Sequence, residues 1–185
     1  GFTVYFENRI MEALYGKDIS DMQSLLGFED LKETIAELGD TSADTHLKLN
    51  LEGRDPDDGM NDVAYEKGHF LLLLMEQTVG REKFDAFLNK HFSSHAFQTI
   101  STEQFIEEYN RDLIGNDSAS AKKIDIDRWV YGPGIPDNCP KIHSVLFEEV
   151  AKQVEAWKKG ASASSLQTKK YTTNEWIRFL RYLPS

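Results

Sequence analysis

The stretch RDPDDGMNDVAYEKGHFLLLLMEQTVG, from Arg54 to Gly80, decides the fold of this chain. Its second half, Asp62–Val79, is apolar on most sides at helical spacing, which is typical of a helix buried among other helices. Gly80 follows directly and is a common residue at a helix end. The longest apolar run, Phe70–Met75, is far shorter than the ~20 residues that a membrane-spanning helix needs. The sequence therefore predicts a helical domain with Phe70–Met75 at its centre.

Helical periodicity continues on both sides of this segment. Ser101 with Gln104, and Thr172 with Glu175, have the spacing of a capping box at a helix start. We expect further helices at Thr3–Tyr15, Ile19–Leu38, Glu82–Phe92, Ser101–Ile114, Ser144–Lys159 and from Thr172 onward. The predicted fold class is all-α.

We interpret the remaining segments as loops that connect the helices. His46–Leu51 alternates loosely and allows one short extended piece, whereas Gly115–Lys123 is interpreted as a polar loop. Gly160–Ser165 is rich in serine and alanine, which makes it the strongest candidate for a linker. We predict that residues 1–159 form one helical lobe, that residues 160–168 are a linker, and that residues 169–185 begin another domain.

Composition excludes several functional classes. Acidic residues outnumber basic ones 31 to 21, and the formal charge of -10 argues against nucleic-acid binding, which needs clustered Lys and Arg. With 40% hydrophobic residues the chain can form a core, so it is not a disordered protein. Cys139 is the single cysteine and excludes an internal disulfide.

The histidines are interpreted as structural. HFSSH at His91–His95 sets two histidines four residues apart, as zinc-binding helices do, but Phe92 stands where a metalloprotease has its catalytic glutamate. His91 falls where an amphipathic helix ends, a position that favours histidine beside the negative helix C-terminus. His46, His69 and His143 have no companions at ligand spacing. We therefore expect no metal ligands in this chain.

Three motifs together resemble a known family. They are GFTVYFENRI at Gly1–Ile10, RDPDDGMNDVAYEKG at Arg54–Gly68 and IDRWVYGPGIP at Ile126–Pro136. They resemble the zinc aminopeptidases of the HEXXH (gluzincin) type, and among these most of all the leukotriene A-4 hydrolase/aminopeptidases and their bacterial homologues. The resemblance covers nearly the whole chain. It implies the helical lobe of a thermolysin-like catalytic domain, followed by the first helix of a C-terminal helical domain.

The resemblance also implies that the zinc ligands lie outside this sequence. In the family, a glutamate that binds zinc stands one residue before the glycine that matches Gly1, and the HEXXH helix with two histidine ligands lies further upstream. The chain has no initiator methionine, so we expect Gly1 to be a cut end and the chain to be a fragment. The parent is then a zinc enzyme that removes N-terminal residues from peptides, while the fragment binds no cofactor and is inactive.

The same resemblance assigns roles to three residues. Tyr65 would be the catalytic tyrosine that donates a hydrogen bond to the oxyanion, although composition alone suggests a buried core tyrosine. Asp57 would contact substrate or cap a turn, and Glu7 would orient a zinc ligand or form a surface ion pair. Met60 and Ala64 depart from the leukotriene hydrolases, which carry a tyrosine and a proline there, and this counts against epoxide hydrolysis.

An alternative from another class stays open at this point. A helical interaction module without catalytic activity could share the aminopeptidase fold, which would explain the missing ligands without truncation. The full motif around Tyr65 favours the enzyme. The expected partners are a peptide substrate and the missing N-terminal part of the same protein, with no nucleic acid and no membrane span. We expect a cytoplasmic location, and export of the parent stays open because a leader could have preceded Gly1.

Overall fold

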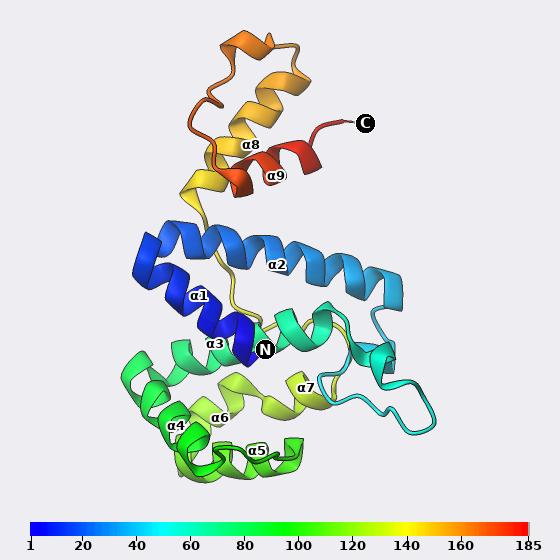
Figure 1. The fold of residues 1–185 in the computed structure, drawn as a ribbon, viewed down its shortest axis with the longest axis vertical. Helices are drawn as coiled ribbons and strands as arrows, with labels where there is room; N and C mark the ends of the chain where they lie inside the picture. Colours follow the sequence, from blue (N-terminus) through cyan, green and yellow to red (C-terminus); the bar gives the residue numbers. More distant parts are fainter. Residues whose placement is uncertain (185) are drawn as a thin grey trace. The chain divides into compact units, whose positions relative to one another are not determined.

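The structure is a computed structural model that describes residues 1–184, and among these residues all regular secondary structure is helical, with no strand (Figure 1). The α-helices are α1 (Phe2–Tyr15), α2 (Lys17–Leu38), α3 (Gly68–Val79), α4 (Arg81–Ser94), α5 (Thr102–Glu108), α6 (Ser118–Ile124), α7 (Ile126–Tyr131), α8 (Val145–Lys158) and α9 (Thr173–Arg181). Short 3₁₀ turns are η1 (Ala43–Thr45), η2 (Pro56–Gly59) and η5 (Ala163–Ser165), and two π-helical turns are η3 (Val63–Lys67) and η4 (Tyr109–Ile114). None of the helices in this range is long and apolar enough to cross a membrane.

Contacts divide the chain into two compact units. The first unit consists of Gly1–Tyr5 and Leu31–Pro140, and the second of Phe6–Asp30 and residues 141–184. The helices α1 and α2 each contribute residues to both units.

The first unit is built around α3, which packs against α4 and α6. The run Phe70–Met75 is buried at every position except the half-buried Leu73. Each fully buried side chain of this size contributes roughly 1.5–3 kcal/mol relative to exposure, so this run is a main source of stability. Gly80 ends α3 with a φ of 88°, where its N–H bonds to the Glu76 carbonyl, and α4 can therefore turn back onto α3.

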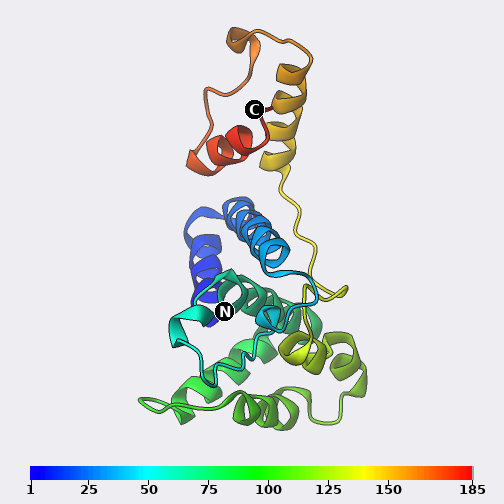
Figure 2. The same cartoon turned by 90° about the vertical axis from the view of Figure 1, so that its right-hand side faces the viewer.

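The second unit has a separate small core. Buried Met22 of α2 packs with residues of α8 and α9, namely Phe147, Val150, Val154 and Phe179. Figures 1 and 2 show α8 and α9 side by side, joined by the loop at residues 159–172. At the start of α9 the Glu175 carboxylate accepts from the backbone N–H and the hydroxyl of Thr172, at 2.7 and 2.9 Å.

These observations confirm the predicted fold class and each of the predicted helices, including both capping boxes. The loop prediction for Gly115–Lys123 was wrong, because Ser118–Ile124 forms α6. The signal was present: Asp117 accepts a hydrogen bond from the N–H of Ser120 and so caps a short helix that buries Ile124. The segment His46–Leu51 contains no strand. The domain boundary at residues 160–168 stays a prediction, while α8 joins α9 in the second unit.

Candidate active site

The first residue of the chain lies against the turn that carries Tyr65. The amino group of Gly1 donates a hydrogen bond of 2.7 Å to the Ala64 carbonyl. A Cβ atom added to Gly1 would lie 2.8 Å from the backbone of Gly68, and one added to Gly68 would lie 2.8 Å from the Cα of Gly1. Only glycine at both positions allows this approach of two backbones. The motifs GFTVYFE and YEKG are therefore in direct contact.

Tyr65 lies in the middle of the π-helical turn η3 and is 41% exposed. The sequence-only alternative of a buried core tyrosine does not describe this side chain. Its hydroxyl makes no hydrogen bond to any of residues 1–184, which leaves the hydroxyl available to another group. Single π-helical turns are rare and occur frequently at functional sites. Here the turn exposes Tyr65 while its neighbours Val63 and Lys67 are buried.

Lys67 fixes this turn from the inside. Its side chain is fully buried, and its Nζ donates to the carbonyls of Thr45 and Gly132 at 2.8 Å each. Burial lowers the pKa of Lys67 to about 8, and the Arg128 charge acts in the same direction. Thr45 is also buried, and its hydroxyl accepts from the N–H of Gly134 at 2.8 Å. Sequence reasoning gave Lys67 no role; a lysine next to a long apolar run was the available signal.

A second anchor holds the start of α1. The Tyr5 hydroxyl donates to the Glu76 carboxylate at 2.5 Å, and Arg81 donates to the other oxygen at 2.7 Å. Tyr5 is buried, with its ring edge-on to Phe84 at a centroid distance of 5.6 Å. The second half of GFTVYFE thus binds α3 by its side chain, while the first half contacts the Tyr65 turn by its backbone.

The other two predicted site residues lie apart from these contacts. Asp57 is exposed in η2, and its backbone N–H bonds to the Asp55 carboxylate at 3.0 Å, so Asp55 and not Asp57 caps the turn. Glu7 is exposed on α1 in the second unit and accepts a hydrogen bond from Gln23. Their proposed roles remain predictions.

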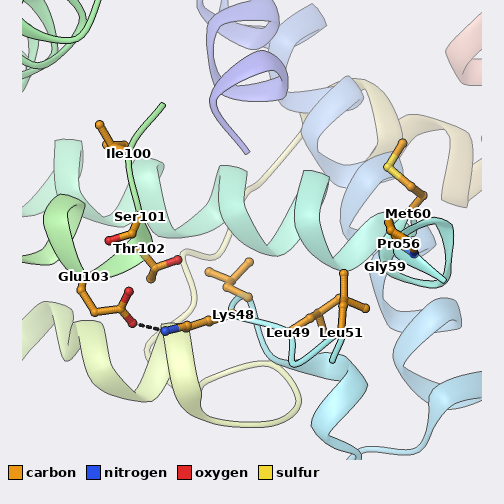
Figure 3. A pocket seen from close by; sticks show the side chains of 11 residues that line it. Lys48, Leu49, Leu51, Pro56, Gly59, Met60, Ile100, Ser101, Thr102 and Glu103 are labelled. Carbon is orange, nitrogen blue, oxygen red and sulfur yellow. Dashed lines mark hydrogen bonds and ion pairs between the residues drawn. The ribbon is translucent and has the colours of Figure 1, made fainter. Parts of the chain in front are cut away.

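A pocket of about 530 Å³ opens beside η2 in the first unit (Figure 3). Leu47, Leu49 and Leu51 line it, as does Met60. The ion pair between Lys48 and Glu103 also lines this pocket. The alternation that suggested an extended piece therefore lines a pocket, although Tyr65 and Asp57 do not.

In the structure, both histidines of the HFSSH motif contact a glutamate that their sequence spacing did not indicate. His91 and His95 both contact the Glu108 carboxylate, which stands at the end of α5. The three form the one group of at least three candidate metal ligands among residues 1–184, and Tyr65 does not belong to it.

Comparison with known proteins agrees with the motifs. Residues 1–129 match the model of the peptidase family M1 domain. Leucine aminopeptidase 2-1 of Meyerozyma guilliermondii is 31% identical over 188 residues, covering 97% of this chain and 30% of the relative. A leukotriene A-4 hydrolase homolog of Botryotinia fuckeliana is 30% identical over 185 residues, covering 98% of this chain and 28% of the relative.

Comparison with solved structures also finds similarity to this family. Native leukotriene A4 hydrolase from Saccharomyces cerevisiae has a TM-score of 0.84 at 28% identity, over 97% of this chain and 30% of that one. The chain spans less than a third of the length of these relatives. The resemblance to the gluzincin aminopeptidases is confirmed. Because the family model matches well over half of its residues, the chain belongs to peptidase family M1.

Proposed function

We propose that this chain is part of a zinc aminopeptidase that removes N-terminal residues from peptides, and that the chain alone is inactive. The relatives named leucine aminopeptidase and the family match support the reaction class. The parent would supply the remaining part of the catalytic domain, and peptides would be its substrates. The predicted cytoplasmic location is part of this proposal.

One observation carries the proposal. The nitrogen of Gly1 lies 2.7 Å from the carbonyl of Ala64, the residue before Tyr65. A residue that precedes Gly1 in the parent would therefore enter beside the Tyr65 turn. The family resemblance assigns the zinc-binding glutamate to that upstream segment. The two halves of the catalytic apparatus would thus be joined where GFTVYFE contacts YEKG.

The catalytic zinc ligands of the proposed enzyme would lie outside this chain, as the family resemblance implies. Tyr65 is not part of any group of three candidate ligands among residues 1–184. The zinc ligands would belong to the parent's upstream segment. When bound there, zinc would polarise the substrate carbonyl and activate the attacking water.

Tyr65 would supply the oxyanion contact. Its hydroxyl is exposed and unoccupied by other groups of residues 1–184, so it can donate to the carbonyl oxygen as that oxygen becomes negative. Such a donor is worth roughly 2.7–4 kcal/mol of activation free energy. Lys67 would act as a positioning residue, because its two buried hydrogen bonds hold the turn that carries Tyr65. Asp57 would contact the substrate and Glu7 would orient a zinc ligand, as the resemblance implies.

The test compares the parent with its Tyr65→Phe variant on amino-acid anilides. The variant should lose ~10²–10³-fold in kcat with a much smaller change in KM, because the hydrogen bond strengthens only in the transition state. Tyr15→Phe is a matched control, since Tyr15 is exposed on α1 and should leave kcat unchanged. Unaltered kcat in Tyr65→Phe would show that Tyr65 is not the oxyanion donor.

Two further measurements test the parts of the proposal that concern the fragment. The 185-residue chain should release no chromophore with or without added zinc. The parent gene should encode HEXXH upstream and Asn-Glu directly before Gly1. Turnover by the chain alone, or an upstream sequence without these ligands, would contradict the proposal and favour the interaction module.

A further inference from the structure

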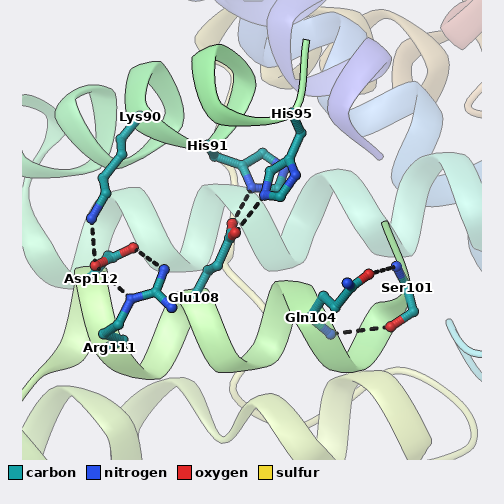
Figure 4. A network of polar contacts seen from close by, with 8 residues as sticks. All are labelled: Lys90, His91, His95, Ser101, Gln104, Glu108, Arg111 and Asp112. Carbon is teal, nitrogen blue, oxygen red and sulfur yellow. Dashed lines mark hydrogen bonds and ion pairs between the residues drawn. The ribbon is translucent and has the colours of Figure 1, made fainter. Parts of the chain in front are cut away.

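Two histidines and a glutamate from different helices converge in the first unit (Figure 4). His91 lies in the last turn of α4, and His95 is the residue that ends this helix. The Nδ1 of His91 is 2.7 Å from one Glu108 oxygen, and the Nε2 of His95 is 2.5 Å from the other. One ligand atom of each residue lies within 4.8 Å of the others.

The three groups have the chemistry of a transition-metal site. Imidazole nitrogens bind zinc at about 2.0–2.1 Å and carboxylate oxygens at about 2.0–2.2 Å, so the donor atoms around a tetrahedral ion stand roughly 3.3 Å apart. The present contacts of 2.7 and 2.5 Å are shorter than this. Each histidine nitrogen would have to move away from its Glu108 oxygen by less than about 1 Å to admit an ion. The His95 side chain is 23% exposed and can make this adjustment more easily than buried His91.

The surroundings hold one ligand rigidly. Phe2 stacks on the His91 ring at a centroid distance of 5.7 Å, and Phe92 and Phe105 contact it edge-on at 5.3 and 5.4 Å. Such packing fixes the direction of the His91 Nδ1 and lowers the local dielectric, which strengthens any bond to a cation.

The arrangement of the Glu108 carboxylate also suits a cation. One of its oxygens faces the His91 ring nitrogen and the other faces the His95 ring nitrogen, so all three ligands are directed toward one another. The nearest basic side chains drawn with the cluster, Lys90 and Arg111, are both paired with Asp112. The printed contacts of the Glu108 carboxylate are thus with the two histidines, while Lys90 and Arg111 contact Asp112.

We propose that His91, His95 and Glu108 form a site for a divalent transition metal of the zinc type, with three protein ligands and a fourth position open to water. An ion there would tie the end of α4 to the end of α5. The expectation of no metal ligands considered the histidine spacing alone; Glu108, 13 residues beyond His95, reaches the histidines only through the fold. This proposal does not depend on the proposed peptidase function.

The test uses the 185-residue chain, purified without a histidine tag and stripped with a chelator. Titration with Zn²⁺ at pH 7.5 by calorimetry should give one ion per chain. The unfolding temperature should rise with Zn²⁺, because a ligand that binds only the folded state stabilises it. X-ray absorption of the loaded chain should show two imidazole ligands and oxygen donors.

Variants separate this site from adventitious binding. Removing a ligand should weaken zinc binding by at least the ~10–100-fold that loss of a supporting residue costs, so both His95→Asn and Glu108→Gln should bind poorly. His143→Asn is the matched control, because His143 is 68% exposed and outside the cluster. This control should bind zinc as the wild type does.

Two results would overturn the proposal. One is that the wild-type chain takes up no zinc, and the other is that His95→Asn and Glu108→Gln bind zinc as tightly as the wild type does. Either would show that the three residues form only a hydrogen-bonded connection between α4 and α5. If Glu108→Gln does not fold, the partly exposed His95→Asn and the absorption spectrum of the wild type decide between the two readings.

Discussion

Replacing Lys67 by methionine tests whether the buried amine holds the Tyr65 turn in place. Methionine keeps an unbranched side chain of similar length but has no donor for the carbonyls of Thr45 and Gly132. Because these carbonyls belong to segments far from η3 in the sequence, the substitution disconnects three parts of the first unit. It removes no surface contact, since Lys67 is fully buried.

The magnitude follows from two opposing terms. Two hydrogen bonds from a charged donor are worth roughly 1.5–3 kcal/mol each, and both are lost. Burial lowers the pKa of Lys67 from 10.5 to about 8, so the ammonium opposes folding at neutral pH. That opposition is at most ~3.5 kcal/mol at ~1.4 kcal/mol per pKa unit, and less wherever water reaches the amine. With the two hydrogen bonds together at ~4.5 kcal/mol, the middle of their range, the substitution should lower the free energy of unfolding by roughly 1–4 kcal/mol at pH 7.

Urea unfolding measures this change. Because the chain has two units, the background should carry Trp157→Phe and Trp176→Phe, so that Trp129, buried in the first unit, is the single reporter. Lys122→Met is the control, since Lys122 is exposed on α6, and surface changes usually stay within about 0.5 kcal/mol.

The pH dependence provides a second check with a defined sign. Below pH 8, Lys67 is protonated in both the folded and the unfolded chain. Between about 8 and 10.5 the folded chain loses this proton first, so the unfolded chain binds more protons and the stability of the wild type rises with pH. The stability gap between wild type and Lys67→Met should then widen from pH 7 to pH 10. The reasoning would be refuted if Lys67→Met lost no more unfolding free energy than Lys122→Met. It would also be refuted if the stability difference between wild type and Lys67→Met stayed constant or narrowed from pH 7 to pH 10.

Two other predictions rest on the backbone. Gly68→Ala should destabilise the first unit, because its Cβ would lie 2.8 Å from Gly1 Cα; overpacking costs about 1–3 kcal/mol and outweighs the ~1 kcal/mol gain in helix propensity. Urea unfolding with the same reporter measures it, and a stabilised variant would contradict the close approach. Limited proteolysis should cut residues 160–165, most of which are exposed, before any bond within residues 62–92, because the backbone hydrogen bonds of this surface segment are all local ones. First cleavage within the buried helices would remove the support for a linker there.

The sequence predicts those parts of the fold that are set by local signals. Periodic apolar residues and capping boxes at Ser101 and Thr172 specify helices without knowledge of their partners, and both are present in the structure. The prediction of a loop at Gly115–Lys123 was wrong because it relied on the same local signals. The helix α6 is only seven residues long, which is too short for apolar periodicity to reveal it. Its one local signal was the cap at Asp117.

The candidate sites could be predicted only in part, because they depend on contacts between distant residues. Tyr65 was identified through a family motif; nothing in the periodicity indicated that it would be exposed on a π-helical turn. Lys67 and Glu108 were missed because their partners, Thr45 and His91 among them, are 22 and 17 residues away. No spacing rule reaches that far without the fold.

Gly1 and Gly68 belong to two different motifs and are in contact in the structure. In the sequence, neither glycine shows any sign of this contact, because each simply stands beside a helix start. In the structure the two backbones meet so closely that a Cβ on either would overlap the other. A turn held this closely would fix Tyr65 relative to the upstream segment that we propose, and such positioning matters because a displacement of about 1 Å can cost ~10²-fold in rate. The glycines in GFTVYFE and YEKG thus have a physical role in the proposed site, because they let its two backbone segments meet.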